Sequence, residues 1–138
     1  MKKTIFTVLL FILGTIATYA QTPEHDQVKA TVSYYLEGGT NNDFETLKKA
    51  FHKDATMKFI SNAGYKEVNA LEFFKKAIKP GPKQNRKTKV VSIDVEGTSA
   101  QAKLRIDYDT FAFIDFMNLL KIDGEWKIVN KIFYRSKK

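Results

Sequence analysis

The pattern of hydrophobic and polar positions changes near Thr88. Before this residue, apolar side chains recur mostly at the spacing that gives a helix one apolar face. After it, they alternate with polar side chains, which is the pattern of a strand with one face buried. This order predicts helices with a strand among them, followed by an antiparallel meander of four strands. Such a sequence is typical of an α+β domain in which helices cover one face of a curved sheet.

The helices are predicted from apolar stripes and from the residues that flank them. In the first helix, Gly38-Gly39 is expected to end the helix because glycine tolerates a left-handed cap. The run Asn41-Asn42-Asp43 and the single residue Asn69 offer N-caps for the other two helices. The predicted helices cover Glu24–Gly38, Phe44–Phe51 and Ala70–Ile78.

The strands are predicted from alternation and from the turns between them. The strongest turn signal is Asp123-Gly124, because a two-residue hairpin turn needs positive φ, which glycine adopts without strain. The strands on either side of this turn are apolar on both faces, so both faces need to be covered. The predicted strands cover Ala55–Ser61, Tyr65–Val68, Thr88–Glu96, Ala100–Tyr108, Thr110–Ile122 and Glu125–Arg135.

Residues 1–20 have the pattern of a secretory signal peptide. Lys2 and Lys3 precede an apolar run from Ile5 to Ile16, and the small residues that follow end at Ala20. A membrane-spanning helix needs roughly 20 apolar residues, which is more than this run supplies, so cleavage is favoured over a lasting membrane anchor. We therefore expect an exported protein, periplasmic or secreted, with a single domain at residues 21–138 and no stable membrane anchor after cleavage.

Composition and charge narrow the chemistry. The chain has no cysteine, so neither disulfides nor thiol chemistry contribute. Its formal net charge of +8 raises the question of nucleic-acid binding. Many of the positive residues, however, gather around one loop with few stacking aromatics among them, so a solvated basic loop is the favoured interpretation. These residues are Lys75, Lys76, Lys79, Lys83, Arg86, Lys87 and Lys89.

Several segments carry a family resemblance. They are Tyr34–Gly38, Phe51–Ala55, Ser92–Val95, Ala100–Lys103 and the hairpin segment Phe116–Lys131, which is the most specific. Together they resemble the NTF2-like superfamily, and within it the small exported bacterial proteins grouped as SnoaL-like and "putative lumazine-binding". The resemblance implies a cone, in which a strongly curved, mostly antiparallel sheet wraps around the helices and leaves a pocket on its concave face. It also implies a homodimer formed through the outer face of the sheet.

The superfamily also contains enzymes, and the chain departs from them. The steroid isomerases place a carboxylate base a few residues after an Asp-Ala-Thr segment, and the ungapped position here is Phe59, which cannot accept a proton. Related dehydratases use a pocket histidine that an aspartate supports. His52 and Asp54 could form such a pair. A structural corner after the second helix is nevertheless the favoured interpretation of these two residues.

Two asparagines interrupt apolar rows in the last hairpin. Asn118 lies in one row and Asn130 in the other. An amide in an apolar environment costs roughly 1–3 kcal/mol unless it is hydrogen-bonded. The favoured interpretation is that the asparagines bond to each other or to the backbone inside a core or an interface. The functional hypothesis is that both side chains set the polarity of a binding pocket whose walls include Tyr34, Tyr35 and Trp126.

The opposite rows of the same hairpin form the predicted dimer face. An apolar patch edged by charge usually marks an interface. The patch consists of Phe113, Met117, Leu119, Val129 and Phe133, and Asp115 interrupts it. Strand parity alone does not determine which row faces the pocket, because a shift of one residue exchanges every side chain.

The favoured function is an exported, non-catalytic protein that binds a small apolar or aromatic molecule in the cone. Few titratable groups are placed for chemistry, whereas aromatic and aliphatic residues are plentiful. The alternatives are a dehydratase or isomerase that uses His52 or Asp54, and a module that binds another exported protein. No motif predicts a metal site, a cofactor or a nucleic-acid partner, and the sequence does not identify the ligand.

Overall fold

The structure, a computed structural model, describes residues 22–138, so the predicted signal peptide lies outside the described residues. The elements are α1 (Pro23–Thr40), α2 (Phe44–Leu47), the short 3-10 helix η1 (Lys48–Ala50), β1 (Phe51–Ser61), β2 (Gly64–Asn69), α3 (Ala70–Ala77), β3 (Lys87–Glu96), β4 (Ser99–Asp107), β5 (Phe111–Ile122) and β6 (Glu125–Lys137). None of the helices within the described residues is both long enough and apolar enough to span a bilayer.

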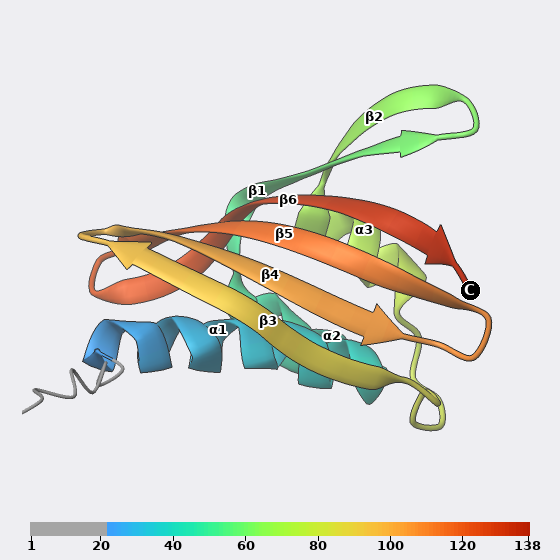
Figure 1. Cartoon of the computed structure of the whole chain (residues 1–138), viewed down its shortest axis with the longest axis horizontal. Helices are drawn as coiled ribbons and strands as arrows, with labels where there is room; N and C mark the ends of the chain where they lie inside the picture. The colour runs from blue at the N-terminus through green and yellow to red at the C-terminus, as the bar shows by residue number, and fades with distance from the viewer. Residues whose placement is uncertain (1–21) are drawn as a thin grey trace, which may run out of the picture.

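The strands form one six-stranded sheet in the order β2-β1-β6-β5-β4-β3. Neighbouring strands are antiparallel except β1 and β6, which run parallel. Figure 1 shows the sheet arching over the helices, with α1 and α2 beneath the meander β3–β6 and α3 near the β1–β2 hairpin. The α+β cone that the sequence predicted is thereby confirmed.

The predicted meander and its hairpin turn are also confirmed. Strands β3 to β6 pair consecutively as antiparallel neighbours. Asp123 and Gly124 both adopt positive φ, 50° and 82°, as a two-residue turn of the primed type requires. The β5–β6 hairpin lies in the middle of the sheet, so one of its faces meets the helices and the other is the outer face of the cone.

The second helix is shorter than predicted, and the strand after it begins earlier. Asp43 caps α2 as expected, because its side chain accepts from the backbone N–H of Thr46 at 3.1 Å. The chain is already extended at Phe51, which pairs with Ile128 of β6. A strand pairing with a residue far along the chain therefore overrides the local helical pattern at Phe51.

The first helix runs past its pair of glycines. It continues to Thr40 instead of ending at Gly38. A Cβ atom on Gly38 would collide with the backbone of Leu47 in α2, and a Cβ atom on Gly39 would collide with the guanidinium group of Arg86. The two glycines therefore permit close packing around the end of α1, which corrects the predicted left-handed cap.

Bulges bend the sheet. Register shifts interrupt the pairing of β1 with β6, of β3 with β4 and of β5 with β6. An extra residue in one strand bends that strand and increases its local twist. The curvature of the cone therefore arises at positions that strict alternation of apolar and polar residues does not reveal.

The bulge in β6 exchanges the two faces of that strand. Ile128 and Asn130 pair with consecutive residues of β5, so Val129 is the extra residue. Before the bulge the even-numbered side chains face the core, and after it the odd-numbered ones do, beginning with Lys131, which is 3% exposed. Strict alternation over Trp126–Tyr134, on which the predicted rows depended, therefore fails at Val129.

Candidate ligand-binding cavity

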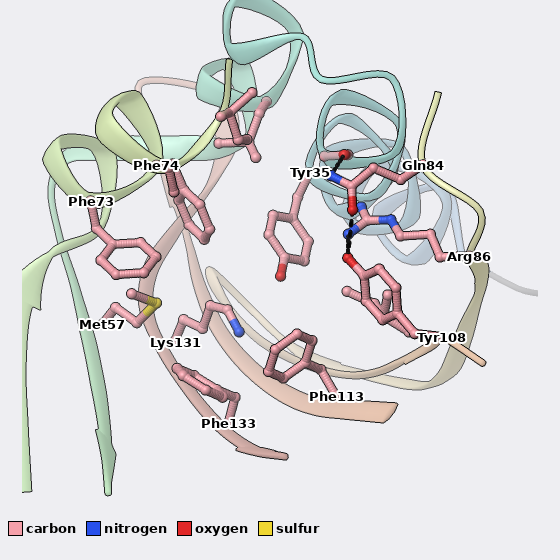
Figure 2. A pocket seen from close by; sticks show the side chains of 15 residues that line it. Tyr35, Met57, Phe73, Phe74, Gln84, Arg86, Tyr108, Phe113, Lys131 and Phe133 are labelled. Atoms are coloured by element: carbon pink, nitrogen blue, oxygen red, sulfur yellow. Dashed lines mark hydrogen bonds between the residues drawn. The ribbon is translucent and has the colours of Figure 1, made fainter. Parts of the chain in front are cut away.

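A cavity of about 240 Å³ lies between the concave face of the sheet and the helices. Figure 2 shows the side chains around it, with Lys131 and Tyr35 directed toward the same central space. Ligand sites in proteins are typically apolar clefts that contain a few well-placed polar groups. The cavity matches this description, because aliphatic and aromatic side chains together make up most of its walls. The aromatic wall residues besides Tyr35 are Phe73, Phe74, Tyr108, Phe113 and Phe133.

Three buried polar side chains from three elements meet beside the cavity. The Tyr35 hydroxyl of α1 donates to Oδ2 of Asp115 on β5 at 2.7 Å. Nζ of Lys131 on β6 donates to Oδ1 of the same carboxylate at 2.5 Å. The side chains of Asp115 and Lys131 are 0% and 4% exposed. Each carboxylate oxygen thus has its own donor, and this satisfies a charge that would be costly to bury alone.

Lys131 has donor capacity beyond its bond to Asp115. An ammonium group carries three N–H donors, and within residues 22–138 Nζ makes one hydrogen bond. Nζ lies 4.3 Å from the ring centroid of Phe133 and 5.6 Å from that of Tyr35, so aromatic faces also stabilise the cation. The remaining donors are available to an acceptor atom in the cavity.

Burial changes the ionisation of both residues that donate to Asp115. Burial lowers the pKa of the Lys131 ammonium group, and the nearby Asp115 carboxylate opposes this effect. Burial also raises the pKa of the Tyr35 hydroxyl well above its usual range, and Asp115 raises it further. The cavity therefore contains an amine that gives up its proton more readily than a free lysine, next to a phenol that retains its proton.

A second polar cluster lines the cavity near the end of α1. Arg86 donates from Nη1 to the Tyr108 hydroxyl at 3.0 Å, and this hydroxyl donates to Oε1 of Gln84 at 2.8 Å, as Figure 2 shows. Arg86 also donates from Nη2 to the Leu36 carbonyl and from Nε to the Thr40 hydroxyl. A cation is favourable there, because the last carbonyls of a helix carry partial negative charge. Arg86 is thus part of the cavity wall, which corrects its assignment to a solvated loop.

The predicted binding residues divide between the two faces of the sheet. Tyr35 lines the cavity. Asn118 and Asn130 lie on the outer face, where Nδ2 of Asn118 donates to Oδ1 of Asn130 at 3.2 Å. Gln101 donates to Asn118, and Asn130 donates to the Thr56 hydroxyl, both at 3.1 Å, so three amides and one hydroxyl form a ladder across four strands. Their predicted position in the pocket is wrong, because the odd-numbered residues of β5 face inward and the bulge exchanges the faces of β6.

The residues of the predicted dimer face change sides for the same reason. Met117 and Leu119 are buried in the core, and Phe113 and Phe133 line the cavity. Val129, the bulged residue, lines a shallow depression on the outer face next to Asn118. The large apolar side chains of β5 and β6 that are exposed are Phe116, Leu120, Ile132 and Tyr134.

Trp126 and Tyr34 lie away from the cavity, around a separate depression. Nε1 of Trp126 donates to Oε2 of Glu24 at 2.7 Å, and Nζ of Lys121 donates to Oε1 at 2.8 Å. The hydrogen bond from Lys121, followed by the one from Trp126, lowers the pKa of the Glu24 carboxyl group. Trp126 therefore attaches the start of α1 to the β5–β6 hairpin, which is a structural role.

His52 and Asp54 lie in β1, and neither lines the cavity. The backbone N–H of Asp54 donates to Nδ1 of His52 at 3.2 Å. The Asp54 carboxylate is exposed and accepts from Lys53, and this hydrogen bond lowers its pKa. Phe59, at the position of the isomerase base, stacks on Phe133 with ring centroids 4.9 Å apart. No cluster of three or more potential metal-binding side chains occurs in the described part of the chain.

Sequence reasoning did not find Lys131, and it gave Asp115 no function. Asp115 is a charged residue in an otherwise apolar row, so a signal was present for it, whereas Lys131 shares its row with Lys127 and Arg135 and resembles an ordinary surface position. A regular hairpin counted from the Asp123-Gly124 turn would pair Lys131 with Phe116 and separate it from Asp115. The bulge pairs Lys131 with Met117 instead, which places it diagonal to Asp115 on the same face. Recognising the ion pair from sequence would have required recognising the bulge.

The sequence and the fold of this chain are similar to those of several known proteins. The sequence profile of the "Putative lumazine-binding" family matches residues 23–134. Aldolase FrzH of Cladobotryum sp. is 25% identical over 121 residues, which cover 86% of this chain and 97% of that protein. An NTF2-like protein of unknown function from Shewanella baltica is 29% identical, with a TM-score of 0.75 over 83% of this chain and 95% of that chain. Another, from Methylobacillus flagellatus, is 28% identical, with a TM-score of 0.73 over 85% of this chain and 95% of that chain.

Proposed function

Because the chain belongs to the "Putative lumazine-binding" family and has the NTF2-like fold, we propose that its cone binds one small, flat aromatic molecule that presents an acceptor oxygen to Lys131. The proposal keeps the predicted class of ligand and replaces most of the predicted contact residues. A cavity of about 240 Å³ is below the roughly 300–1,000 Å³ of typical ligand pockets, which favours a compact ligand.

The observation that carries this proposal is a buried cation with spare donors inside an aromatic cavity. Phenylalanine and tyrosine rings supply apolar area for a planar molecule, and they prefer stacked or edge-to-face contacts. Lys131 supplies a charged donor for a carbonyl or anionic oxygen. Lumazine, a bicyclic pteridine with two carbonyl oxygens, has this chemistry, and it is the natural first probe of a family that bears its name.

Titration with lumazine tests the proposal, with unsubstituted pteridine as the ligand that lacks both oxygens. We expect saturable binding of lumazine and weaker binding of pteridine. Lys131→Met should weaken lumazine binding by about tenfold or more, because a hydrogen bond to a charged group contributes roughly 1.5–3 kcal/mol. Lys127→Met is the matched control, since Lys127 is on the same strand and donates to the Lys49 carbonyl outside the cavity. Equal affinity of the two variants, or no binding by either ligand, would overturn the proposal.

Catalysis on a carbonyl compound is a second candidate, which the aldolase name of the Cladobotryum relative supports. Lys131 lines the cavity and can polarise a carbonyl oxygen, and Asp115, which bonds to Nζ of Lys131 from beside the cavity, can accept a proton through it. The predicted alternative that used His52 or Asp54 is not retained, because neither residue lines the cavity. The test is exchange of α-hydrogens for deuterium in small aromatic ketones, followed by NMR. Exchange that Asp115→Asn abolishes would support catalysis, and exchange no faster than in buffer would exclude it for these substrates.

We also propose that two copies pair through the outer face of the sheet. Phe116, Leu120, Ile132 and Tyr134 expose apolar groups there, and the described helices all lie on the other face (Figure 1). A two-fold contact would place this patch against its own copy and cover it. Light scattering at micromolar concentration should give the mass of a dimer, and Ile132→Lys should give a monomer. Tyr34→Lys, a change to an exposed residue on the helix side, should leave the dimer intact. A monomeric wild-type protein would contradict the proposed dimer.

Finally, we propose that residues 1–20 direct export and are then removed. The support from the sequence is the basic pair Lys2 and Lys3, followed by an apolar run and small residues that end at Ala20. Thr22 caps α1, and Glu24 anchors its first turn to the hairpin, so a cut after Ala20 leaves the folded domain complete. Mass spectrometry of protein recovered from its source should show a chain that begins at Gln21. A full-length mass would contradict cleavage.

A further inference from the structure

We infer that Lys131 can form an imine with the carbonyl carbon of an aromatic aldehyde or ketone held in the cavity. This inference deepens the proposed function and rests on it, because the carbonyl compound must first bind. It changes the role of Lys131 from a hydrogen-bond donor to a nucleophile.

The surroundings of Lys131 differ from those of the other ion-paired lysines in the described chain. Its side chain is 4% exposed, whereas the side chains of the others are between 26% and 81% exposed. Only the neutral form of an amine attacks a carbonyl carbon, and an apolar cavity favours that form by disfavouring the charge. Burial lowers the pKa of Lys131 in this way.

Asp115 is placed to move the protons that the reaction requires. Its Oδ1 atom lies 2.5 Å from Nζ and can accept a proton from the ammonium group, which leaves a free amine. The nitrogen lone pair then forms a bond to the carbonyl carbon, and the former carbonyl oxygen takes a proton from the nitrogen to give a carbinolamine. Asp115 returns its proton to the carbinolamine hydroxyl, which leaves as water while the carbon–nitrogen double bond forms.

The balance of atoms and charge is complete without a further reactant. An ammonium group and a carbonyl compound yield a protonated imine and one water molecule. The protonated imine remains opposite the Asp115 carboxylate, so the buried pair has the same net charge before and after the reaction. The hydrogen bond from Tyr35 to Oδ2 holds this carboxylate in place throughout, which makes Tyr35 a positioning residue.

The walls of the cavity favour the imine once it has formed. The rings of Phe133 and Tyr35 already lie near Nζ, at 4.3 Å and 5.6 Å from their centroids, and they stabilise a cation at this point. Phe113 and Phe74 belong to the same walls and offer apolar surface to an aromatic substituent on the carbonyl carbon. The preferred partner is therefore an aromatic carbonyl compound rather than a small polar one.

Reductive trapping tests the inference. Wild-type protein is incubated with about one equivalent of 4-hydroxybenzaldehyde and with sodium cyanoborohydride, which reduces imines to stable amines, and the modified lysines are mapped by peptide mass spectrometry. Burial lowers the pKa of Lys131 and so increases the share of neutral amine, and the cavity holds the aldehyde beside Nζ, so we expect more label on Lys131 than on Lys127. Labels confined to exposed lysines would overturn the inference, and this comparison needs no variant.

Two variants and one competition assay separate this inference from the proposed function. Lys131→Arg keeps a cation opposite Asp115 and cannot form an imine, so its labelling should fall to that of the surface lysines alone. Asp115→Asn should slow labelling of Lys131 without affecting Lys127. If the aldehyde displaces lumazine but leaves no label on Lys131, the binding proposal stands and the imine is refuted. If it neither displaces lumazine nor labels Lys131, both fail.

Discussion

The two faces of the β5–β6 hairpin carry comparable polar pairs with different consequences. On the inner face Asp115 and Lys131 form a buried ion pair, and on the outer face Asn118 and Asn130 form a hydrogen bond at the surface. Both pairs interrupt apolar rows of the same two strands. A buried charge must be paired or neutralised, whereas an exposed amide can bond to water instead. The curvature of the sheet buries the inner pair and leaves the outer pair in water. Losing one partner should therefore cost much more stability on the inner face than on the outer face.

The largest expected effect comes from removing one partner of the inner pair. Asp115→Ala leaves the Lys131 ammonium group and the Tyr35 hydroxyl without their acceptor. Breaking a buried pair from one side typically costs about 3–5 kcal/mol. Urea unfolding should show a loss of this size in the free energy of unfolding. Asn118→Ala, on the same strand and the outer face, is the matched control.

The double variant Asp115→Leu, Lys131→Met shows what the loss in Asp115→Ala consists of. Apolar residues of similar volume often replace a buried ion pair at little or no cost in stability. We therefore expect the double variant to be more stable than Asp115→Ala while losing the response to lumazine. If both variants were equally destabilised, the cost would come from altered packing and not from an unpaired charge.

Tyr35→Phe should have a smaller effect on the same face. The change removes the hydroxyl that donates to Oδ2 of Asp115 and keeps the ring in the cavity. A buried acceptor that loses its donor costs about 1–3 kcal/mol. The same urea titration measures it, and Tyr65→Phe is the control, because the Tyr65 hydroxyl bonds to Glu67 at the exposed end of the sheet. A loss no greater than that of the control would show that water replaces the hydroxyl.

The pH dependence of stability should also reflect the inner face. The lowered pKa of Lys131 means that the folded state binds fewer protons than the unfolded state just below 10.5, so stability should rise with pH in that window. The raised pKa of Tyr35 means that the folded state retains a proton above 10.0, so Tyr35 should lower stability as pH rises further. Lys131→Met should remove the rise, and Tyr35→Phe should reduce the decline. Unfolding curves recorded at constant ionic strength from about pH 8 to about pH 11 measure both slopes.

Tyr65 provides the control for the alkaline decline. The hydrogen bond to Glu67 raises the pKa of its hydroxyl as well, but this side chain is exposed. Tyr65→Phe should therefore change the decline less than Tyr35→Phe does. Equal changes would mean that burial of Tyr35 is not what resists its ionisation.

The comparison of the two faces also shows what the sequence could predict. The hairpin turn at Asp123-Gly124 and the alternation in β3 to β6 are local patterns, and the structure confirms the meander they predict. The family match in the hairpin correctly predicted the cone. Helix and strand boundaries failed where a distant contact decides, as at Phe51, which pairs with Ile128.

The site was harder to predict, because it depends on parity across a bulge. Tyr35 lines the cavity, whereas its neighbour Tyr34, which was given the same role, lies at a separate depression. Asn130 was assigned to the cavity on the assumption of strict alternation, which fails at Val129. Asn118 was assigned to the wrong face of β5, because strand parity alone does not determine which face is concave. Arg86 was grouped with its basic neighbours, because nothing local shows that it reaches the carbonyls at the end of α1. Long-range geometry thus determined each residue that the sequence misplaced.

The smallest expected effect is on the outer face, where Asn130→Ala removes one acceptor and one donor from the amide ladder. Asn130 accepts from Asn118 and donates to Thr56 at the surface. Hydrogen bonds contribute about 0.5–1.5 kcal/mol net, and solvent can replace these, so we expect a loss near the lower end of this range. Urea unfolding of Asn118→Ala, Asn130→Ala and the double variant gives the coupling energy of the pair.

The dependence of this coupling energy on protein concentration tests whether the outer face lies in a dimer contact. In a monomer the ladder meets water, and the coupling should be small at every concentration. In the proposed dimer the same amides lie among the apolar residues that a second copy covers, and burial would make each unpaired amide costly. A coupling that grows as the protein is concentrated would therefore show that the outer pair becomes buried like the inner one. A coupling that stays small and constant while light scattering reports a dimer would place the contact elsewhere on the protein.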